Sequence, residues 1–411
     1  MAGAGKLLID IDGDLTRIAE ITDGRLIGLT VVTTKSASIA GNIYLGRVER
    51  AAEQLAAAFI DIGQQRSGFL ALSETRPLGR NPEKSEKISN YLAEGDKVLV
   101  QVQRDGFEGK GPKLTTRLAL TGRTLVMTPG DGEIRISRRI DDGAARARLA
   151  ALLEGLVEPG EGFIVRTAAA GVAEQYIRQD IDSLREEWAA IEAGRDLGRP
   201  PSLLLAGADP VLACLRDLDC PAFGEIVIND PAAFTRARTY CQKLIPELHE
   251  RLHHYQNIKP LFESFQSGSD SVEADVEAAL AEQVSLPSGG RVHFSETPAL
   301  IAIDVDAGGT VRGGAEETAL QTNLDAADEI ARQIRLRNLG GLLVIDFVSM
   351  KRPANQPKLL DRLKSAVSGD PVPVFVGGFT RFGLVELTRK RQRATLAEVM
   401  ASHIQGEGID G

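Results

Sequence analysis

The chain has 411 residues, of which 43% are hydrophobic and 26% are charged, and its formal net charge is −9. This length is enough for two to four compact units with buried cores, and the composition is that of an ordinary globular protein. The acidic net charge argues against a protein that coats nucleic acid indiscriminately, although basic side chains outnumber acidic ones in residues 99–140 and 332–393.

The sequence shows no membrane or export signal. No apolar run approaches the length of about 18 residues that a spanning helix needs, and the first segment, MAGAGKLLIDIDGD, acquires acids almost at once. The three cysteines lack any CxxC pairing, which is typical of reduced and mostly buried thiols. We therefore expect a cytoplasmic protein.

The first 118 residues predict short strands. Residues 1–38 contain three runs that are typical of short strands, KLLIDID, LTRIAEIT and RLIGLTVVT. The runs that follow have glycines at their corners, as in an OB-type barrel. Phe59 and Phe69 fall on successive strands of this barrel, where they could stack bases or, as is more common for phenylalanine in a small barrel, form core.

The middle of the chain mixes strands and helices. Residues 119–201 contain strand-like runs, including GFIVRTAA, and then a helix from Glu174 to about Ala193. A structural pairing with an acid on a helix would account for Arg166 in that run. A hinge rich in Gly and Pro (194–202) precedes a further mixed region, and a helix is expected from about Ser271.

Two acidic strand ends, separated by one amphipathic helix, are the most informative feature of the chain. TPALIAIDVDAGG carries Asp304 and Asp306, and LLVIDF carries Asp346. A strand–helix–strand unit makes two parallel strands, usually neighbours, and ligands bind at the carboxyl ends of such strands. Converging carboxylates suit Mg²⁺ and hence phosphodiester chemistry, although acids also cap strands at a solvated sheet edge.

The intervening helix is predicted from TNLDAADEIARQIRLRNLGG. We expect Thr322 or Asn323 as its N-cap and Gly340-Gly341 at its end. The acids of its early turns are Asp325, Asp328 and Glu329. The apolar residues of its inner stripe are Leu324, Ala327, Ala331 and Ile334.

An alternative comes from IDIDGDLT, which resembles the opening motif of haloacid-dehalogenase phosphatases. Asp10 would be the nucleophile and Asp12 the acid. That class needs an uninterrupted Rossmann-like sheet, whereas hairpins follow here, so this alternative is disfavoured.

Longer motifs resemble the ribonuclease E/G family of endoribonucleases. They are SLPSGGRVHFSETPALIAIDVD, TNLDAADEIARQIRLRNLGGLLVIDF and TRFGLVELTRKR from its catalytic region, AAAFIDIG, GFLAL and KGPKLTT from its OB-fold, and GFIVRTAA from its sensor of a 5′-monophosphate. The resemblance covers about residues 5–398. It implies a multidomain α/β protein in which an RNase H-like subdomain carries inserted OB-fold and 5′-sensor subdomains, followed by a DNase I-like α/β catalytic subdomain.

The resemblance also sets expected boundaries. They are 1–38 and 202–273 for the two RNase H-like parts, 39–118 for the OB-fold, 119–201 for the 5′-sensor, 274–398 for the catalytic subdomain and 399–411 for a tail.

By this resemblance the protein is a Mg²⁺-dependent endoribonuclease that cuts single-stranded RNA in RNA processing, including rRNA processing, or in RNA decay. Asp304 and Asp346 would hold the metal, and Asp306 would support them. Phe59, Phe69 and Lys110 would contact RNA. The 5′-phosphate would be bound by Gly122, Val126, Arg166, Thr167 and Arg381, and the fixed fork of an arginine suits phosphate oxygens.

Two features depart from the family pattern. The family usually has Asn where Asp306 stands, and the added carboxylate would strengthen metal binding or raise the pKa of its neighbour. A diverged RNA-binding or assembly factor without cleavage activity is therefore an alternative. The cysteine pair that links protomers through zinc in many relatives does not follow ATLAEVM in this sequence, so a zinc-linked tetramer is not expected, while a homodimer is compatible with the sequence.

Overall fold

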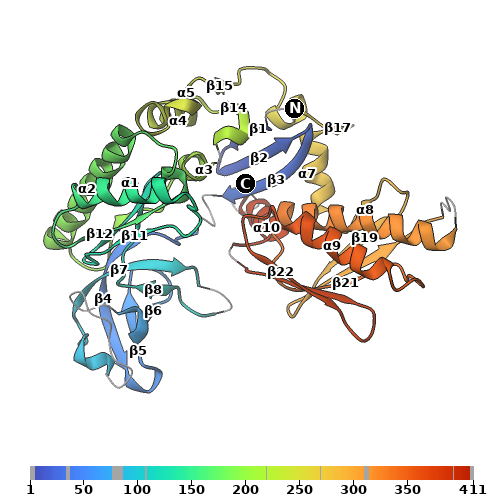
Figure 1. Cartoon of the computed structure of the whole chain (residues 1–411). Coiled ribbons are helices and arrows are strands. Elements are labelled where there is room, and N and C mark those ends of the chain that lie inside the picture. Colours follow the sequence, from blue (N-terminus) through green and yellow to red (C-terminus); the bar gives the residue numbers. More distant parts are fainter. Residues whose placement is uncertain are drawn as a thin grey trace. The chain divides into compact units, whose positions relative to one another are not determined.

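The computed structural model describes residues 5–33, 38–75, 87–106, 109–218, 220–268, 270–309, 314–391 and 393–407, which form two compact units (Figure 1). Unit 1 comprises Met1–Ala37, Pro221–Phe234 and Arg251–Gly411, and unit 2 comprises Ser38–Cys220 and Thr235–Glu250. The chain is a mixed α/β protein with several sheets, one of which closes into a five-stranded, OB-like barrel. No helix within the described ranges is long and apolar enough to cross a membrane.

The first sheet of unit 1 joins the N-terminal strands to strands from the middle of the chain. Its order is β15-β14-β1-β2-β3, with β1 parallel to β14 and antiparallel to β2. The bounds are Gly5–Asp12 for β1, Leu15–Thr22 for β2, Arg25–Thr33 for β3, Phe223–Ile228 for β14 and Leu252–His254 for β15. The three strands predicted in residues 1–38 are thus confirmed.

Local chemistry explains the turn between β2 and β3. Asp23 and Gly24 form a two-residue loop in which both have positive φ, 50° and 70°, as a type I′ hairpin turn requires. Asp10, the nucleophile of the phosphatase alternative, is buried and accepts two hydrogen bonds from Arg17 and one from Asn229. It therefore has a structural role in this sheet.

Helices cover one side of this sheet. The buried cluster on that side includes Leu8, Leu26 and Phe262, and the helices that contribute to it are α6 (Leu261–Ser264), α7 (Val272–Leu280), the end of α8 (Ala315–Leu336) and α10 (Leu396–Glu407). Ser271 caps α7, as expected from the sequence. The predicted tail overlaps α10, and residues 408–411 lie outside the described residues.

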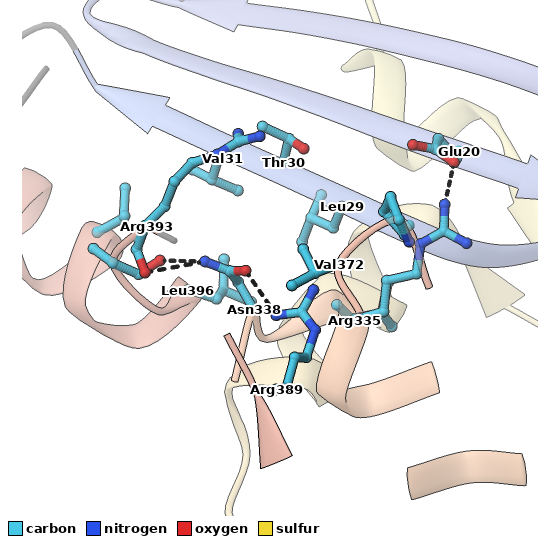
Figure 2. A pocket seen from close by; sticks show the side chains of 15 residues that line it. Glu20, Leu29, Thr30, Val31, Arg335, Asn338, Val372, Arg389, Arg393 and Leu396 are labelled. Atoms are coloured by element: carbon cyan, nitrogen blue, oxygen red, sulfur yellow. Dashed lines mark hydrogen bonds and ion pairs between the residues drawn. The ribbon is translucent and has the colours of Figure 1, made fainter. Parts of the chain in front are cut away.

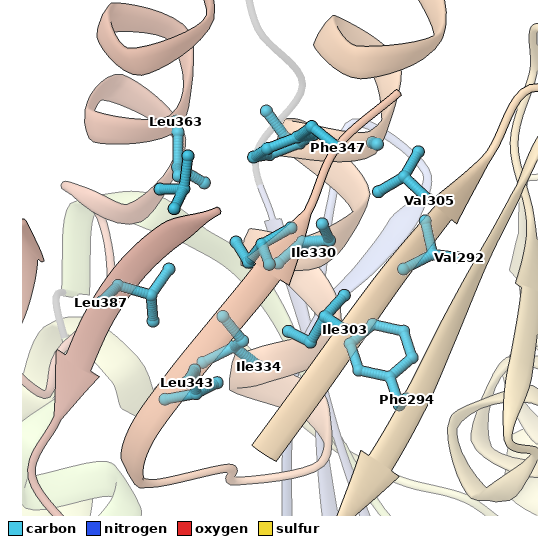
Figure 3. Packing of buried hydrophobic residues seen from close by; sticks show 14 of the residues in the cluster. Val292, Phe294, Ile303, Val305, Ile330, Ile334, Leu343, Phe347, Leu363 and Leu387 are labelled. Atoms are coloured by element: carbon cyan, nitrogen blue, oxygen red, sulfur yellow. The ribbon is translucent and has the colours of Figure 1, made fainter. Parts of the chain in front are cut away.

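The second sheet of unit 1 has six strands in the order β18-β19-β20-β21-β23-β22. The bounds are Gln283–Ser285 for β18, Arg291–Glu296 for β19, Ile301–Asp306 for β20, Gly341–Asp346 for β21, Val385–Arg389 for β23 and Val374–Phe379 for β22. One face packs against α8 and α9 (Asn355–Val367) through side chains such as Ile303, Ile330 and Leu343 (Figure 3). A small ribbon, β16 (Gln266–Ser267) and β17 (Asp270–Ser271), completes the strands of this unit.

The predicted start of helix α8 is wrong. The helix begins at Ala315, and Glu316 and Glu317 occupy its first turn. AEETALQ consists mostly of good helix formers, which extend the helix before the predicted cap. Thr322 and Asn323 are fully buried in its interior, so Asp325, Asp328 and Glu329 are not in its early turns.

The end and the inner stripe of α8 also differ from the prediction. The helix stops at Leu336, and the residue with left-handed backbone there is Asn338 rather than a glycine. Ala327 and Ile334 are buried as expected, whereas Leu324 and Ala331 are only half-buried.

Unit 2 contains the barrel. Strands β4, β5, β6, β8 and β7 follow one another around it, β4 pairs with β7 to close it, and β13 adds to the outer edge of β4. The bounds are Ile43–Ala52 for β4, Ala57–Asp61 for β5, Gly68–Ala71 for β6, Lys113–Thr115 for β8, Lys97–Arg104 for β7 and Ser202–Leu205 for β13. Short 3₁₀ turns lie at Glu53–Leu55, Leu72–Glu74 and Ile88–Asn90. The predicted OB-like barrel is therefore present.

The rest of unit 2 is a four-stranded sheet with helices, in the order β11-β12-β10-β9. Its strands are β11 (Ile134–Ile136), β12 (Glu161–Val165), β10 (Leu125–Pro129) and β9 (Leu120–Thr121). Its helices are α1 (Gly143–Glu154), α2 (Glu174–Leu197), α3 (Pro210–Asp217) and α5 (Pro246–His249), with a 3₁₀ turn at Thr167–Ala169. A further 3₁₀ turn, Cys220–Ala222, begins at the last residue of this part of unit 2 and continues into unit 1. Helix α4 (Pro231–Leu244) begins in unit 1 and ends in unit 2. Helix α2 runs four residues past Ala193, so the predicted hinge begins inside a helix.

Candidate functional site

Asp304 and Asp346 lie side by side on the exposed face of the second sheet of unit 1. Asp304 is near the end of β20, Asp346 ends β21, and the two are direct partners in the parallel register of these strands. Neighbouring strands are about 4.8 Å apart, so two adjacent carboxylates can reach one ion. The structure thus brings together the two strand ends that the sequence singled out.

The alternation of the strands explains why these carboxylates point outward. In β20 the buried residues are Ile301, Ile303 and Val305, and the exposed ones alternate with them. The buried side chains pack against the helices on the other face, so Asp304 and Asp306 must lie on the open face.

The segment after β21 is hydrogen-bonded to two polar side chains of α8. Asn323 donates through Nδ2 to the carbonyl of Val348 at 2.8 Å and accepts from the N–H of the same residue at 3.0 Å. The Glu316 carboxylate accepts from the backbone N–H groups of Lys351 and Arg352 at 2.8 and 2.9 Å. Hydrogen bonds from Arg352 and Lys351 lower the pKa of Glu316. No pattern in the sequence predicts either contact.

Asp306 has a different environment from the pair. It is the last residue of β20, and its Oδ1 accepts from the N–H of Gly308 at 3.0 Å. Its cross-strand neighbour in β19 is Arg291, and that of Asp304 is His293. The described residues contain no group of three or more His, Cys, Asp or Glu side chains that could hold a metal ion.

Phe59 and Phe69 lie on the outer surface of the barrel. They are cross-strand partners in β5 and β6, and their rings meet edge to face with centroids 5.9 Å apart. Both are half-buried, whereas their neighbours Ala58, Ile60 and Leu70 fill the core. The phenylalanines are not part of the barrel core, which was the alternative left open by the sequence.

Lys110 lines an open hollow of about 420 Å³ in unit 2. Gln64, Gln65 and Arg66, from the β5–β6 loop, lie on its wall, and Arg66 donates to the carbonyl of Gly109. The hollow thus combines two cations with side-chain amides.

Arg166 follows β12 and is engaged by both backbone and side-chain acceptors. Its Nη1 donates to the carbonyl of Gly122 at 2.8 Å, and its Nη2 donates to Asp217 Oδ1 at 2.5 Å. Asp217 is the last residue of α3, so the arginine is paired with a helix acid, as the structural alternative predicted. Burial disfavours ionisation of Asp217, but hydrogen bonds from Arg216 and Arg166 outweigh it and lower the pKa of Asp217.

The loop that carries Gly122 is held by a buried carboxylate. Asp180 of α2 accepts from the backbone N–H groups of Arg123, Thr124 and Leu125 at 3.1, 2.7 and 3.1 Å. A Cβ at position 122 would lie 2.4 Å from Asp180 Oδ1, so only glycine fits there. The sequence did not reveal Asp180, because a lone Asp in a helix usually faces solvent.

The other residues of the predicted phosphate pocket are distributed as follows. Val126 lies in β10 and pairs with Ile164 of β12, and the Thr167 hydroxyl is 3.3 Å from that of Ser137. Arg381 belongs to unit 1, in the turn between β22 and β23. Its participation in the pocket stays a prediction.

A pocket in unit 1 lies away from Asp304 and Asp346, near the beginning of β21, where Gly341 pairs with Arg389 (Figure 2). Its volume is about 110 Å³. Arg389 on its wall is buried and donates to Asp370 through Nε at 2.9 Å and to Asn338 through Nη1 at 3.1 Å. Arg335, also on the wall, donates to Glu20 at 2.5 Å, so these two arginines have structural partners.

Comparison with known proteins identifies the class of protein. The model of the ribonuclease E/G family matches residues 119–392. The chain is 37% identical over 389 residues to ribonuclease E of Haemophilus influenzae, covering 93% of this chain and 41% of that protein. It is 34% identical to ribonuclease G of the same organism and 33% identical to ribonuclease G of Escherichia coli K12, each over 407 residues, 97% of this chain and 82% of the relative.

The chain therefore belongs to the ribonuclease E/G family. It spans less than half the length of the ribonuclease E relative and about four fifths of that of the ribonuclease G relatives.

Proposed function

We propose that this chain is a Mg²⁺-dependent endoribonuclease that cuts single-stranded RNA. The observation that carries the proposal is the register pairing of Asp304 with Asp346 on an exposed sheet face. Family membership over nearly the whole chain supports it. In the finer fold that we propose, the first sheet of unit 1 is RNase H-like, the second is DNase I-like, and unit 2 holds the OB-fold and the 5′-sensor.

The donor set fits Mg²⁺. Two carboxylates on adjacent strands leave room for water and a phosphate oxygen, which is how this ion usually binds. When bound there, Mg²⁺ supplies charge stabilisation at the phosphate and an activated water. Asp304 and Asp346 would orient these groups from a rigid sheet, while Asp306 and Arg291 set the charge beside them. Attack of water on phosphorus and departure of the 3′-oxygen would leave 5′-phosphate and 3′-hydroxyl ends.

The test is an assay of the purified chain on single-stranded RNA with Mg²⁺ and with excess EDTA. We expect internal cleavage in the first case and intact RNA in the second. RNA that is bound but stays intact with Mg²⁺ would instead support the alternative of a non-catalytic RNA-binding factor, which membership of the family does not favour.

We also propose that RNA binds the outer face of the barrel at Phe59, Phe69 and Lys110. Phe69→Ala is expected to weaken RNA binding by about 1–3 kcal/mol, because base–aromatic stacking contributes that much. Lys110→Ala should weaken it in a salt-dependent way through counterion release. Fluorescence anisotropy and melting temperature are measured on the same variants.

Leu70→Ala is the matched control for that test, because Leu70 follows Phe69 in the same strand and is fully buried. It should lower the melting temperature and leave the affinity of folded molecules unchanged. The same behaviour in Phe69→Ala would refute the contact.

We propose that Arg166 and Thr167, with Gly122 and Val126 of the same unit, recognise a 5′-phosphate. RNA with a 5′-monophosphate should be cut roughly 10- to 100-fold faster than the same RNA with a 5′-hydroxyl, since hydrogen bonds to charged groups contribute about 1.5–3 kcal/mol. Arg166→Ala should erase the difference. Arg178→Ala, at an exposed ion pair on α2, should preserve it. Equal rates on both substrates in the unaltered chain would contradict the proposal.

A further inference from the structure

The guanidinium of Arg166 is already paired with a carboxylate. Two of its partners are the carbonyls of Gly122 and Arg123, at 2.8 and 3.3 Å from Nη1, and the third is the Asp217 carboxylate, 2.5 Å from Nη2. Carboxylate and phosphate oxygens compete for the same donor directions on an arginine. Asp217 therefore occupies a position on Arg166 that a phosphate oxygen would take.

Asp217 has a second arginine to hold it. Arg216 donates through Nε to Asp217 Oδ1 at 3.1 Å and through Nη2 to Oδ2 at 2.9 Å, and its Nη1 donates to the carbonyl of Thr121 at 3.2 Å. The Asp217 side chain is 45% exposed and that of Arg166 is 26% exposed. Asp217 can therefore leave Arg166 and remain paired with Arg216 at the solvated edge of the site.

Arg166 itself has less freedom to move. The carbonyl that receives its shortest backbone hydrogen bond belongs to Gly122, next to the three N–H groups that Asp180 holds. Asp180 is 1% exposed, and this fixes the loop. An incoming anion must therefore displace the carboxylate, because the arginine cannot be drawn away from its loop.

We infer that Asp217 determines the affinity of the Arg166 site for a 5′-phosphate, by occupying the phosphate's place on Nη2 until the phosphate displaces it. This inference rests on the proposed recognition of a 5′-phosphate by Arg166. Asp217 acts through Arg166 and is thus a specificity-determining residue. Removing its charge should strengthen binding of a 5′-phosphate, whereas a residue that only positions Arg166 would weaken it when altered.

The test compares Asp217→Asn with the unaltered chain on RNA that carries a 5′-monophosphate or a 5′-hydroxyl. We expect the ratio of kcat/KM for the two substrates to rise about 3- to 10-fold. The dissociation constant of a 5′-phosphorylated oligonucleotide, measured by anisotropy in EDTA, should fall by a similar factor. Asp217→Ser repeats the test without an amide oxygen that could still accept from Arg166.

Two further variants complete the design. Glu174→Gln removes an exposed arginine partner on α2 and should leave the ratio unchanged. Arg166→Ala combined with Asp217→Asn should lose the whole gain, because the effect acts through Arg166.

The outcomes separate the inference from the function on which it rests. Suppose that the unaltered chain prefers the 5′-phosphate and that Arg166→Ala abolishes this preference. If the Asp217 variants then leave the preference unchanged or lower it, Asp217 has only a structural role and the inference is overturned. If the unaltered chain shows no preference, the phosphate site itself is refuted, and the inference falls with it.

Discussion

Asp346→Asn is expected to lower the rate of RNA cleavage by roughly 10²–10⁴-fold, and Asp304→Asn by a similar factor. Each substitution removes one of two adjacent carboxylates and with it several kcal/mol of charge stabilisation at the scissile phosphate. Both side chains are exposed on the face opposite the packed helices, so the fold should be preserved. Single-turnover cleavage and circular dichroism measure the two effects.

Two other aspartates make that experiment specific. Asp361→Asn removes an exposed carboxylate on α9 and should cleave RNA at the normal rate. Asp306→Asn should retain or raise activity, because the resemblance to the family implies an Asn at this position. Cleavage by Asp346→Asn within a few-fold of the unaltered chain would refute the assignment, and complete loss in Asp306→Asn would mean that this chain uses a different metal shell.

Asp370→Asn should cost unit 1 about 3–5 kcal/mol of stability. Asp370 and Arg389 are both buried, with 5% and 3% of their side chains exposed, and they share two hydrogen bonds. Neutralising the aspartate leaves a buried guanidinium without its counter-charge, which is much more costly than losing a solvated pair. Urea unfolding followed by circular dichroism gives the change in the free energy of unfolding.

The single tryptophan can be used to check which unit loses stability. Trp188 lies in α2 of unit 2, so its fluorescence reports on that unit. Asp328→Asn, at an exposed pair with Arg362 in unit 1, is the matched control and should change the transition little. Equal stability of the Asp370 and Asp328 variants would show that the buried pair contributes no more than the exposed one.

Local patterns predicted the parts of this chain that depend on neighbours in sequence. Residues 5–33 contain three mainly apolar runs separated by short polar turns, and the strands lie where those runs place them. Asp304 and Asp346 could be paired in advance because one helix between two apolar strands leaves few topologies.

The parts that the sequence did not predict depend on distant partners. Asn323 bonds a residue 25 positions away, Asp217 one 51 away, and Asp180 one 56 away. In isolation each is a short polar side chain, which suggests a helix cap or a solvated face. The sequence alone therefore predicts Thr322 or Asn323 as a cap, whereas the burial of Asn323 and its two hydrogen bonds to Val348 exist only in the folded chain.

The pairing of β1 with β14 has a consequence for synthesis. Asp10 and its partner Asn229 are separated by 219 residues, and ribosomes add about 5–20 residues per second. Residues 5–33 therefore wait roughly 10–45 seconds as a three-stranded hairpin sheet whose β1 edge lacks its neighbour. Open strand edges recruit other strands, so the unpaired edge of β1 exposes the nascent protein to aggregation during this interval.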